Sequence, residues 1–197
     1  RQPYNTSSTI VYQQLIFIAC LENGMSDSKP YIDRPMLDVL PQPVLIENAN
    51  LYAFILKGNT QNILNQCIKS LNTAGNGHIE YYPISPYILM TMVDLQQIKS
   101  GVKPYSELGS ISEHELTFFV MLAAGKTHGN VFIAERIVLH VPFIFVDNSF
   151  AMTAGREIYG FPKQWGWLDF PSEPDNLTTM TVDTDVIQTY APDAKAS

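Results

Sequence analysis

The sequence is poor in charge and in long apolar runs, and both shortages exclude whole classes of protein. Charged residues make up 16% of the 197 residues, and the formal net charge is −7. Because no basic run is present, non-specific binding to nucleic acid is not expected. No apolar stretch reaches the roughly eighteen residues that a membrane-spanning helix needs. The hydrophobic content of 46% instead predicts an ordinary globular domain with a packed core.

Cysteine and histidine are also scarce, and neither forms a pattern that binds metal. The two cysteines, Cys20 and Cys67, are far apart, so two reduced thiols and one disulfide both fit the sequence. The four histidines are scattered and the H-E-x-x-H pattern is absent, which predicts that there is no metal site. The apolar segment 9–20 is interrupted by two glutamines and has no basic residues leading into it, so we expect a cytoplasmic protein rather than a secreted one.

The spacing of prolines and apolar residues divides the chain into a lead-in and a domain. Four prolines between residues 24 and 43 exclude a long regular element there and predict an extended loop. We therefore assign residues 1–43 to a lead-in and residues 44–197 to the domain. Residues 45–56 predict a buried strand, and a helix is predicted to open after it with Asn59 or Thr60 as its N-cap. Residues 72–77 are predicted to end that helix as a turn.

The rest of the chain has mostly strand character. Strands are predicted over 79–93, 116–122, 131–145 and 177–190. Residues 94–101 are predicted to form a turn or short helix, and residues 123–130 a connection. Pro83, Pro86 and Pro142 fall inside strand runs and predict a kink or bulge at each place. The predicted fold class is α+β: a β-rich, antiparallel, barrel-like sheet with one or two helices.

Lys163 is the most informative single residue. It lies among Phe161, Trp165 and Trp167, and no acidic residue occurs between Glu157 and Asp169. An exposed lysine titrates near pH 10.4, but apolar surroundings lower the pKa. The free amine can then attack a carbonyl and form a Schiff base, which withdraws electrons from the substrate. The alternative is that Lys163 follows a turn and points into water.

The residues that lead to Lys163 resemble the lysine motif of the acetoacetate decarboxylase family. That motif is D-N-x-x-A-x-x-x-G-R-E, a four-residue spacer and then P-K. The matching residues here are Asp147, Asn148, Ala151, Gly155, Arg156, Glu157, Pro162 and Lys163. A second patch, residues 108–113, is similar to the family's L-G-x-Y-x-E, with Ile111 at the aromatic position. The convincing resemblance covers about residues 108–170.

This resemblance implies a function, a fold and a set of site residues. Lys163 would condense with a β-keto acid, and the imine would withdraw electrons as carbon dioxide leaves, so no cofactor is required. Glu113 would assist proton transfer. The implied fold is the family's barrel-like sheet, and the implied partners are a keto acid and further copies of the same chain. No nucleic acid or membrane partner is expected.

Several further residues are predicted to shape the site. Glu115 faces the same side of a strand as Glu113, whereas His114 faces the other. Arg156 either holds a substrate carboxylate or forms an ion pair that supports the lysine turn, and we favour the ion pair. The remaining candidates are Glu157, Phe161, Gln164 and Trp165.

Two departures from the family pattern leave alternatives open. Gln164 stands where the family's best-known members have a second lysine, so burial would have to lower the pKa of Lys163. Residues 47–51 lack the arginine that would pair with a substrate carboxylate. The alternatives are therefore a ligand-binding or structural member without catalysis, and an aldolase or dehydratase that acts on larger keto acids.

The ends of the chain also differ from the resembled family. The sequence begins at Arg1 and stops at Ser197, whereas the family continues through more strands after its lysine. We expect a fragment or a processed chain. A second chain that completes the barrel and a reduced fold are the alternatives.

Overall fold

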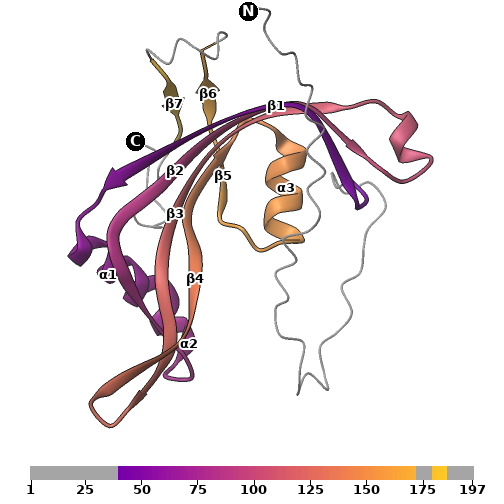
Figure 1. Cartoon of the computed structure of the whole chain (residues 1–197). Helices are drawn as coiled ribbons and strands as arrows, with labels where there is room; N and C mark the ends of the chain where they lie inside the picture. Colours follow the sequence, from indigo (N-terminus) through magenta and orange to yellow (C-terminus); the bar gives the residue numbers. More distant parts are fainter. Residues whose placement is uncertain (1–39, 172–178, 186–197) are drawn as a thin grey trace, which may run out of the picture.

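The computed structural model describes residues 40–171 and 179–185 (Figure 1). Its main feature is a curved sheet of five strands in the order β1-β2-β3-β4-β5. These strands are β1 (Val44–Lys57), β2 (Glu80–Ser100), β3 (Ile111–His128), β4 (Val131–Val146) and β5 (Lys163–Trp165). Two short strands, β6 (Trp167–Asp169) and β7 (Thr181–Asp183), form a separate antiparallel pair.

Helices lie on both faces of this sheet. Between β1 and β2 come α1 (Thr60–Cys67), a π-helical turn (Ile68–Asn72) and α2 (Thr73–Gly75). Between β4 and β5 comes α3 (Ser149–Glu157), and a short 3-10 turn (Tyr105–Glu107) precedes β3. Figure 1 shows α3 beneath the concave side of the curved sheet, whereas α1 and α2 lie on its other side. No helix in these ranges is long and apolar enough to cross a membrane.

The sheet is antiparallel except at one edge. β1 to β4 pair with their neighbours in antiparallel fashion, and β5 pairs in parallel with β4, with Ile144 opposite Lys163. Within the described residues β1 and β5 stay at opposite edges, so the sheet is not closed into a barrel. The predicted α+β, mostly antiparallel fold class is confirmed, and the barrel is open in this part of the chain.

Several local predictions are confirmed. Asn59 is the N-cap of α1, and its side chain accepts a hydrogen bond from the Asn62 amide. β2 loses its register with β3 between Pro83 and Ile88, as expected where proline removes a ladder donor. β4 also carries an extra residue opposite β3 next to Pro142, because Phe118 pairs with Phe143 and Val120 pairs with His140.

Three local predictions are wrong, two of them because strand pairing overrides local sequence. Residues 94–100 continue β2, since they pair with the start of β1. Most of 123–130 continues β3, and the connection to β4 is a two-residue turn at Gly129 and Asn130. The helical segment also continues to Gly75 rather than ending at Asn72. Of the strand predicted over 177–190, residues 179–185 are described, and β7 is the strand among them. Residues 1–39, including Cys20, lie outside the described ranges.

The two faces of β3 have different characters. One small core cluster joins Ile63 and Cys67 of α1 to Val120 and Leu122 of β3. Another joins Leu116 of β3 to neighbours on β2 and β6. Both use even-numbered residues of β3. The odd-numbered residues near its start face the side where α3 lies, and these include polar groups.

Candidate active site

β3 presents two glutamates side by side on the concave face of the sheet. Glu113 and Glu115 are two residues apart, so their side chains project from the same face. Glu113 is only 6% exposed. The hydroxyl of Thr117, the next residue on this face, donates to Glu115 Oε1 at 2.7 Å. The alternation of side chains along β3 therefore brings the two glutamates together on one face, where they are mostly shielded from water.

α3 and the turn after it bring Lys163 to these glutamates. Asn148 caps α3, because its side chain accepts from the amides of Phe150 and Ala151. After α3 ends, the amide of Phe161 donates to the carbonyl of Gly155 at 2.9 Å, which folds the chain back onto the helix. Lys163 then opens β5, pairing in parallel with β4.

Three hydrogen bonds hold the start of the lysine motif against β3. Asp147 accepts from the backbone amide of His114 at 2.8 Å, and it bonds the His114 ring at 2.7 Å. The side chain of Asn148 donates to the carbonyl of Ser112 at 2.9 Å. The two residues that open the motif thus hold the glutamate-bearing strand and the lysine-bearing segment in a fixed relation.

Gly155 provides the space that the lysine side chain occupies. A Cβ atom at this position would lie 2.7 Å from Lys163 Cε and 3.0 Å from Cγ, and closer still to Cδ. Such distances are shorter than van der Waals contact allows. The glycine of the motif is therefore needed for the stem of Lys163 to pass along α3.

Lys163 forms ion pairs with both glutamates. Its Nζ lies 3.1 Å from Glu113 Oε1 and 3.0 Å from Glu115 Oε2. The lysine is 9% exposed. The prediction that Lys163 is buried in a pocket agrees with this geometry, and the predicted shared side of Glu113 and Glu115 is observed directly.

The electrostatics of the group differ from the sequence-based expectation for the lysine. Burial alone lowers the pKa of Lys163, but Glu115 and Glu113 oppose it strongly enough that the net pKa is raised. Burial, together with the nearby Glu115 carboxylate, raises the pKa of Glu113 to about 7, although Lys163 pulls it down. The resting site therefore holds an ammonium ion, and Glu113 exchanges its proton near neutral pH. The expectation that burial lowers the pKa of Lys163 overall is therefore wrong.

These three charged groups lie in a pocket of about 450 Å³. Its walls are mostly apolar: aliphatic side chains come from all four long strands, and aromatic ones come from β3, from α3 and from the turn after α3. Examples are Ile46, Ile98 and Ile111 on the first side and Phe150 and Phe161 on the second. Among the described residues that line it, Lys163 is the sole cation. The pocket can therefore hold an apolar molecule whose polar end reaches the lysine.

Not every predicted site residue lines this pocket. Phe161 does, but Arg156, Glu157, Gln164 and Trp165 are not among its lining residues. The Arg156 guanidinium donates to the backbone carbonyl of Lys163 at 3.2 Å. Arg156 thus supports the turn that carries Lys163, as predicted. It does so through a hydrogen bond to the backbone and not through the predicted ion pair. Trp165 packs edge-on against Trp167, with ring centroids 6.3 Å apart.

Sequence reasoning gave no role to several residues that build the site. Thr117 bonds a glutamate, and Asp147 and Asn148 fasten the motif to β3. Thr117 could have been predicted, because side chains two residues apart on a strand share a face and Thr117 follows Glu113 and Glu115 at that spacing. The described residues contain no cluster of side chains that could hold a metal ion.

Comparison with known proteins gives matches in family and fold. The family model for acetoacetate decarboxylase matches residues 79–189, which is more than half of the chain. A search of curated proteins finds no sequence match.

Two solved structures are similar at low identity. One is acetoacetate decarboxylase from Legionella pneumophila, at 14% identity and a TM-score of 0.49, which covers 77% of this chain and 48% of that one. The other is the enduracididine biosynthesis enzyme MppR, complexed with the condensation product of pyruvate and imidazole 4-carboxaldehyde, at 17% identity and a TM-score of 0.43. That match covers 61% of this chain and 39% of MppR. This chain thus spans less than half the length of either relative. On the family match, it belongs to the acetoacetate decarboxylase family.

Proposed function

We propose that this protein forms a Schiff base between Lys163 and the ketone of a β-keto acid, and releases carbon dioxide from the adduct. The observation that carries this proposal is the position of Lys163 Nζ, held between Glu113 and Glu115 inside a mostly apolar pocket. The family match supports the reaction class. The substrate and the chemistry are proposals for this chain.

The first step is loss of a proton from the lysine. The raised pKa of Lys163 makes it an ammonium ion at rest, and an ammonium ion has no lone pair with which to attack. Glu113 is 3.1 Å from Nζ, and its pKa of about 7 suits it to take up a proton at neutral pH. Transfer from Nζ to Glu113 gives a free amine next to a neutral carboxylic acid.

The later steps use the same two groups. The amine adds to the ketone carbon, and Glu113 returns its proton to the hydroxyl group that leaves as water, which gives a protonated imine. The bond between the α-carbon and the carboxylate then breaks, and its electron pair moves through the α-carbon to the imine nitrogen, giving carbon dioxide and an enamine. Glu113, again a carboxylate, takes up a proton from water near neutral pH and donates it to the enamine carbon. Water then hydrolyses the imine, which frees the ketone and Lys163.

The walls of the pocket suggest the type of β-keto acid. They are mostly apolar, and the described lining supplies no second cation to pair with a carboxylate. An acid with an apolar tail would bury that tail against Ile98 and Ile111, whereas acetoacetate would leave this part of the pocket unfilled. Each buried methylene contributes about 0.8 kcal/mol, so kcat/KM should rise about fourfold per methylene until the pocket is full.

The proposal is tested by measuring release of labelled carbon dioxide. Acetoacetate and 3-oxooctanoate, each labelled with ¹³C at the carboxyl carbon, are mixed with the protein and followed by NMR. Lys163→Met is the control for spontaneous decarboxylation. Faster release with the native protein than with Lys163→Met supports the proposal. Equal rates, together with ligand-induced thermal stabilisation, would instead support the non-catalytic binding alternative.

We also propose that copies of this chain associate with one another and that the protein is cytoplasmic. The edge strand β1 exposes Leu51 and Ile55, at 55% and 76%, and these two side chains project from one face. An edge strand with exposed apolar residues is a favourable surface for contact with another copy. Light scattering after size exclusion would give the oligomeric state, and a monomer at all concentrations would contradict self-association.

A further inference from the structure

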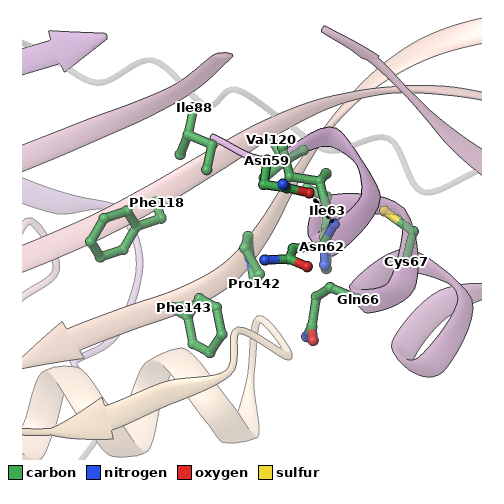
Figure 2. A pocket seen from close by; sticks show the side chains of 11 residues that line it. Asn59, Asn62, Ile63, Gln66, Cys67, Ile88, Phe118, Val120, Pro142 and Phe143 are labelled. Carbon is green, nitrogen blue, oxygen red and sulfur yellow. Dashed lines mark hydrogen bonds between the residues drawn. The ribbon is translucent and has the colours of Figure 1, made fainter. Parts of the chain in front are cut away.

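A second cavity, of about 480 Å³, lies behind the Lys163 pocket on the opposite face of the sheet. It is lined by Phe118 and Val120 of β3, whereas the Lys163 pocket is lined by Thr117 and Phe119 of the same strand. The alternation of side chains along β3 thus separates the two spaces by the thickness of the sheet. α1 covers this second cavity from the other side (Figure 2).

The walls of the cavity are apolar and include two aromatic rings. Phe118 and Phe143 are cross-strand partners on β3 and β4, and both rings line the space. Ile63 of α1 and Ile88 of β2 complete the apolar surface. Figure 2 shows the α1 side chains on one side of the cavity and the rings of Phe118 and Phe143 on the other. A flat or compact apolar molecule would contact all of these groups.

Polar groups occur at a few positions in this lining. Asn62 and Gln66 lie four residues apart on α1, so their amide side chains share one face of the helix and line the cavity. His140 of β4 also lines it, and its Nε2 atom is buried without a hydrogen-bond partner among the described residues. A buried polar atom that lacks a partner costs about 1–3 kcal/mol. A ligand group that reached this edge of the ring would remove that cost.

The groups that line the cavity are neutral at physiological pH. Burial lowers the pKa of His140, which keeps the imidazole uncharged. Burial also raises the pKa of the Cys67 thiol, so this group stays protonated. No aspartate, glutamate, lysine or arginine of the described chain lines the space. A charged ligand would therefore lose its hydration without gaining a counter-ion.

The geometry points to a second ligand site between α1 and the sheet, for a neutral and mostly apolar molecule with one hydrogen-bonding group. An aromatic or alicyclic ring with a hydroxyl or carbonyl group has this chemistry. The ring would pack against Phe118 and Phe143, and the polar group would bond His140 or the amides of α1. A space of 480 Å³ is within the range of small-molecule sites.

The test uses two probes of nearly equal shape, phenol and toluene, with the full chain. Binding is followed by NMR of the isoleucine methyl groups, with Ile63 and Ile88 assigned. We expect both probes to shift these two signals, with a Kd on the order of 1 mM for phenol. No shift of either signal with either probe would overturn the proposal.

One blocking variant and one matched control locate the site. Asn62→Trp should block the cavity and abolish the shifts. Asn65→Trp places the same side chain on the same helix at an exposed position that does not line the cavity, and it should bind as the native protein does. Equal losses in both variants would show that the helix, and not the cavity, is affected, and would overturn the proposal.

The role of the hydrogen-bonding group is tested by His140→Phe. This change removes the ring nitrogens and keeps a flat ring. Phenol should bind roughly threefold to tenfold more weakly, while toluene binding stays unchanged. An equal effect on both probes, or no effect on phenol, would contradict the predicted polar contact. Release of carbon dioxide in the Lys163 pocket serves as an independent readout, which Asn62→Trp should leave intact.

Discussion

The two faces of β3 show how the surroundings of a charge determine its role. On the concave face, Glu113 and Glu115 share the buried ammonium of Lys163. On the other face, His114 lies between Asp147 at 2.7 Å and Asp94 at 3.6 Å, with its side chain 36% exposed. The first group is shielded from water, so its charges perturb one another strongly. The second is partly hydrated, and polar contacts between side chains that water reaches contribute little to stability.

The largest effect should follow from removing the ammonium on the concave face. Lys163→Met leaves the buried carboxylate of Glu113 and the partly buried one of Glu115 without their partner, and breaking a buried ion pair in this way costs about 3–5 kcal/mol. The loss should be greatest above pH 7, where Glu113 is ionised, and smaller near pH 5, where it takes up a proton. Urea unfolding at both pH values measures this difference. An unchanged stability at pH 8 would mean that the three groups do not interact as described.

The next effect concerns the proton on Glu113. Its folded pKa of about 7 lies above the ordinary value of 4.5, so the folded protein retains a proton that the unfolded chain releases. Glu113 therefore makes stability fall as pH rises from about 4.5 to 7, by roughly 3 kcal/mol. Glu113→Gln removes this contribution. The difference in unfolding free energy between native protein and variant should change across that window, and a constant difference would refute the raised pKa.

A smaller effect is expected where α3 touches the lysine stem. Gly155→Ala introduces a Cβ that overlaps the Lys163 side chain, and overpacking of this kind costs about 1–3 kcal/mol. Gly75→Ala is the matched control, because it is also a helical glycine but its added Cβ would meet Ile79 at an ordinary 3.6 Å. Thermal unfolding compares the two, and carbon dioxide release should fall only in Gly155→Ala. Equal behaviour of both variants would contradict the close approach.

The smallest effect should come from the other face of β3. His114→Asn removes the partly exposed imidazole that contacts Asp147 and Asp94, while the backbone amide of residue 114 still donates to Asp147. The loss of stability should be about 1 kcal/mol or less, and release of carbon dioxide should be unchanged. Calorimetry and the labelled-substrate assay provide the two readouts. A large loss of activity would show that the two faces are not independent.

Local sequence was enough for some features of this fold and not for others. The N-cap at Asn59 and the bulge next to Pro142 follow from single residues whose backbone chemistry is restrictive. The shared face of Glu113 and Glu115 follows from strand alternation. Residues 94–100 look polar enough for a turn, yet they form strand because β1 lies beside them. The partner strand, β1, is distant in the sequence, so no local pattern around residues 94–100 reveals the pairing.

The same limit explains the error in the lysine pKa. The neighbours of Lys163 in sequence are aromatic, and they suggest a pocket that disfavours charge. Its neighbours in space are two carboxylates from positions 48 and 50 residues away in the sequence. Trp165 meanwhile lies away from the pocket lining. The motif directed attention to Lys163, but only the fold shows what surrounds its amine.

The central claim is that the amine of Lys163 attacks a keto acid, and borohydride trapping tests it most directly. The native protein is incubated with 3-oxooctanoate and sodium borohydride at pH 7, digested and analysed by mass spectrometry. We predict a stable mass increase on the peptide that contains Lys163, dependent on substrate, with no matching increase at Lys99, a partly exposed lysine of β2. No adduct at Lys163 across a panel of keto acids, or equal labelling of both lysines, would contradict the account.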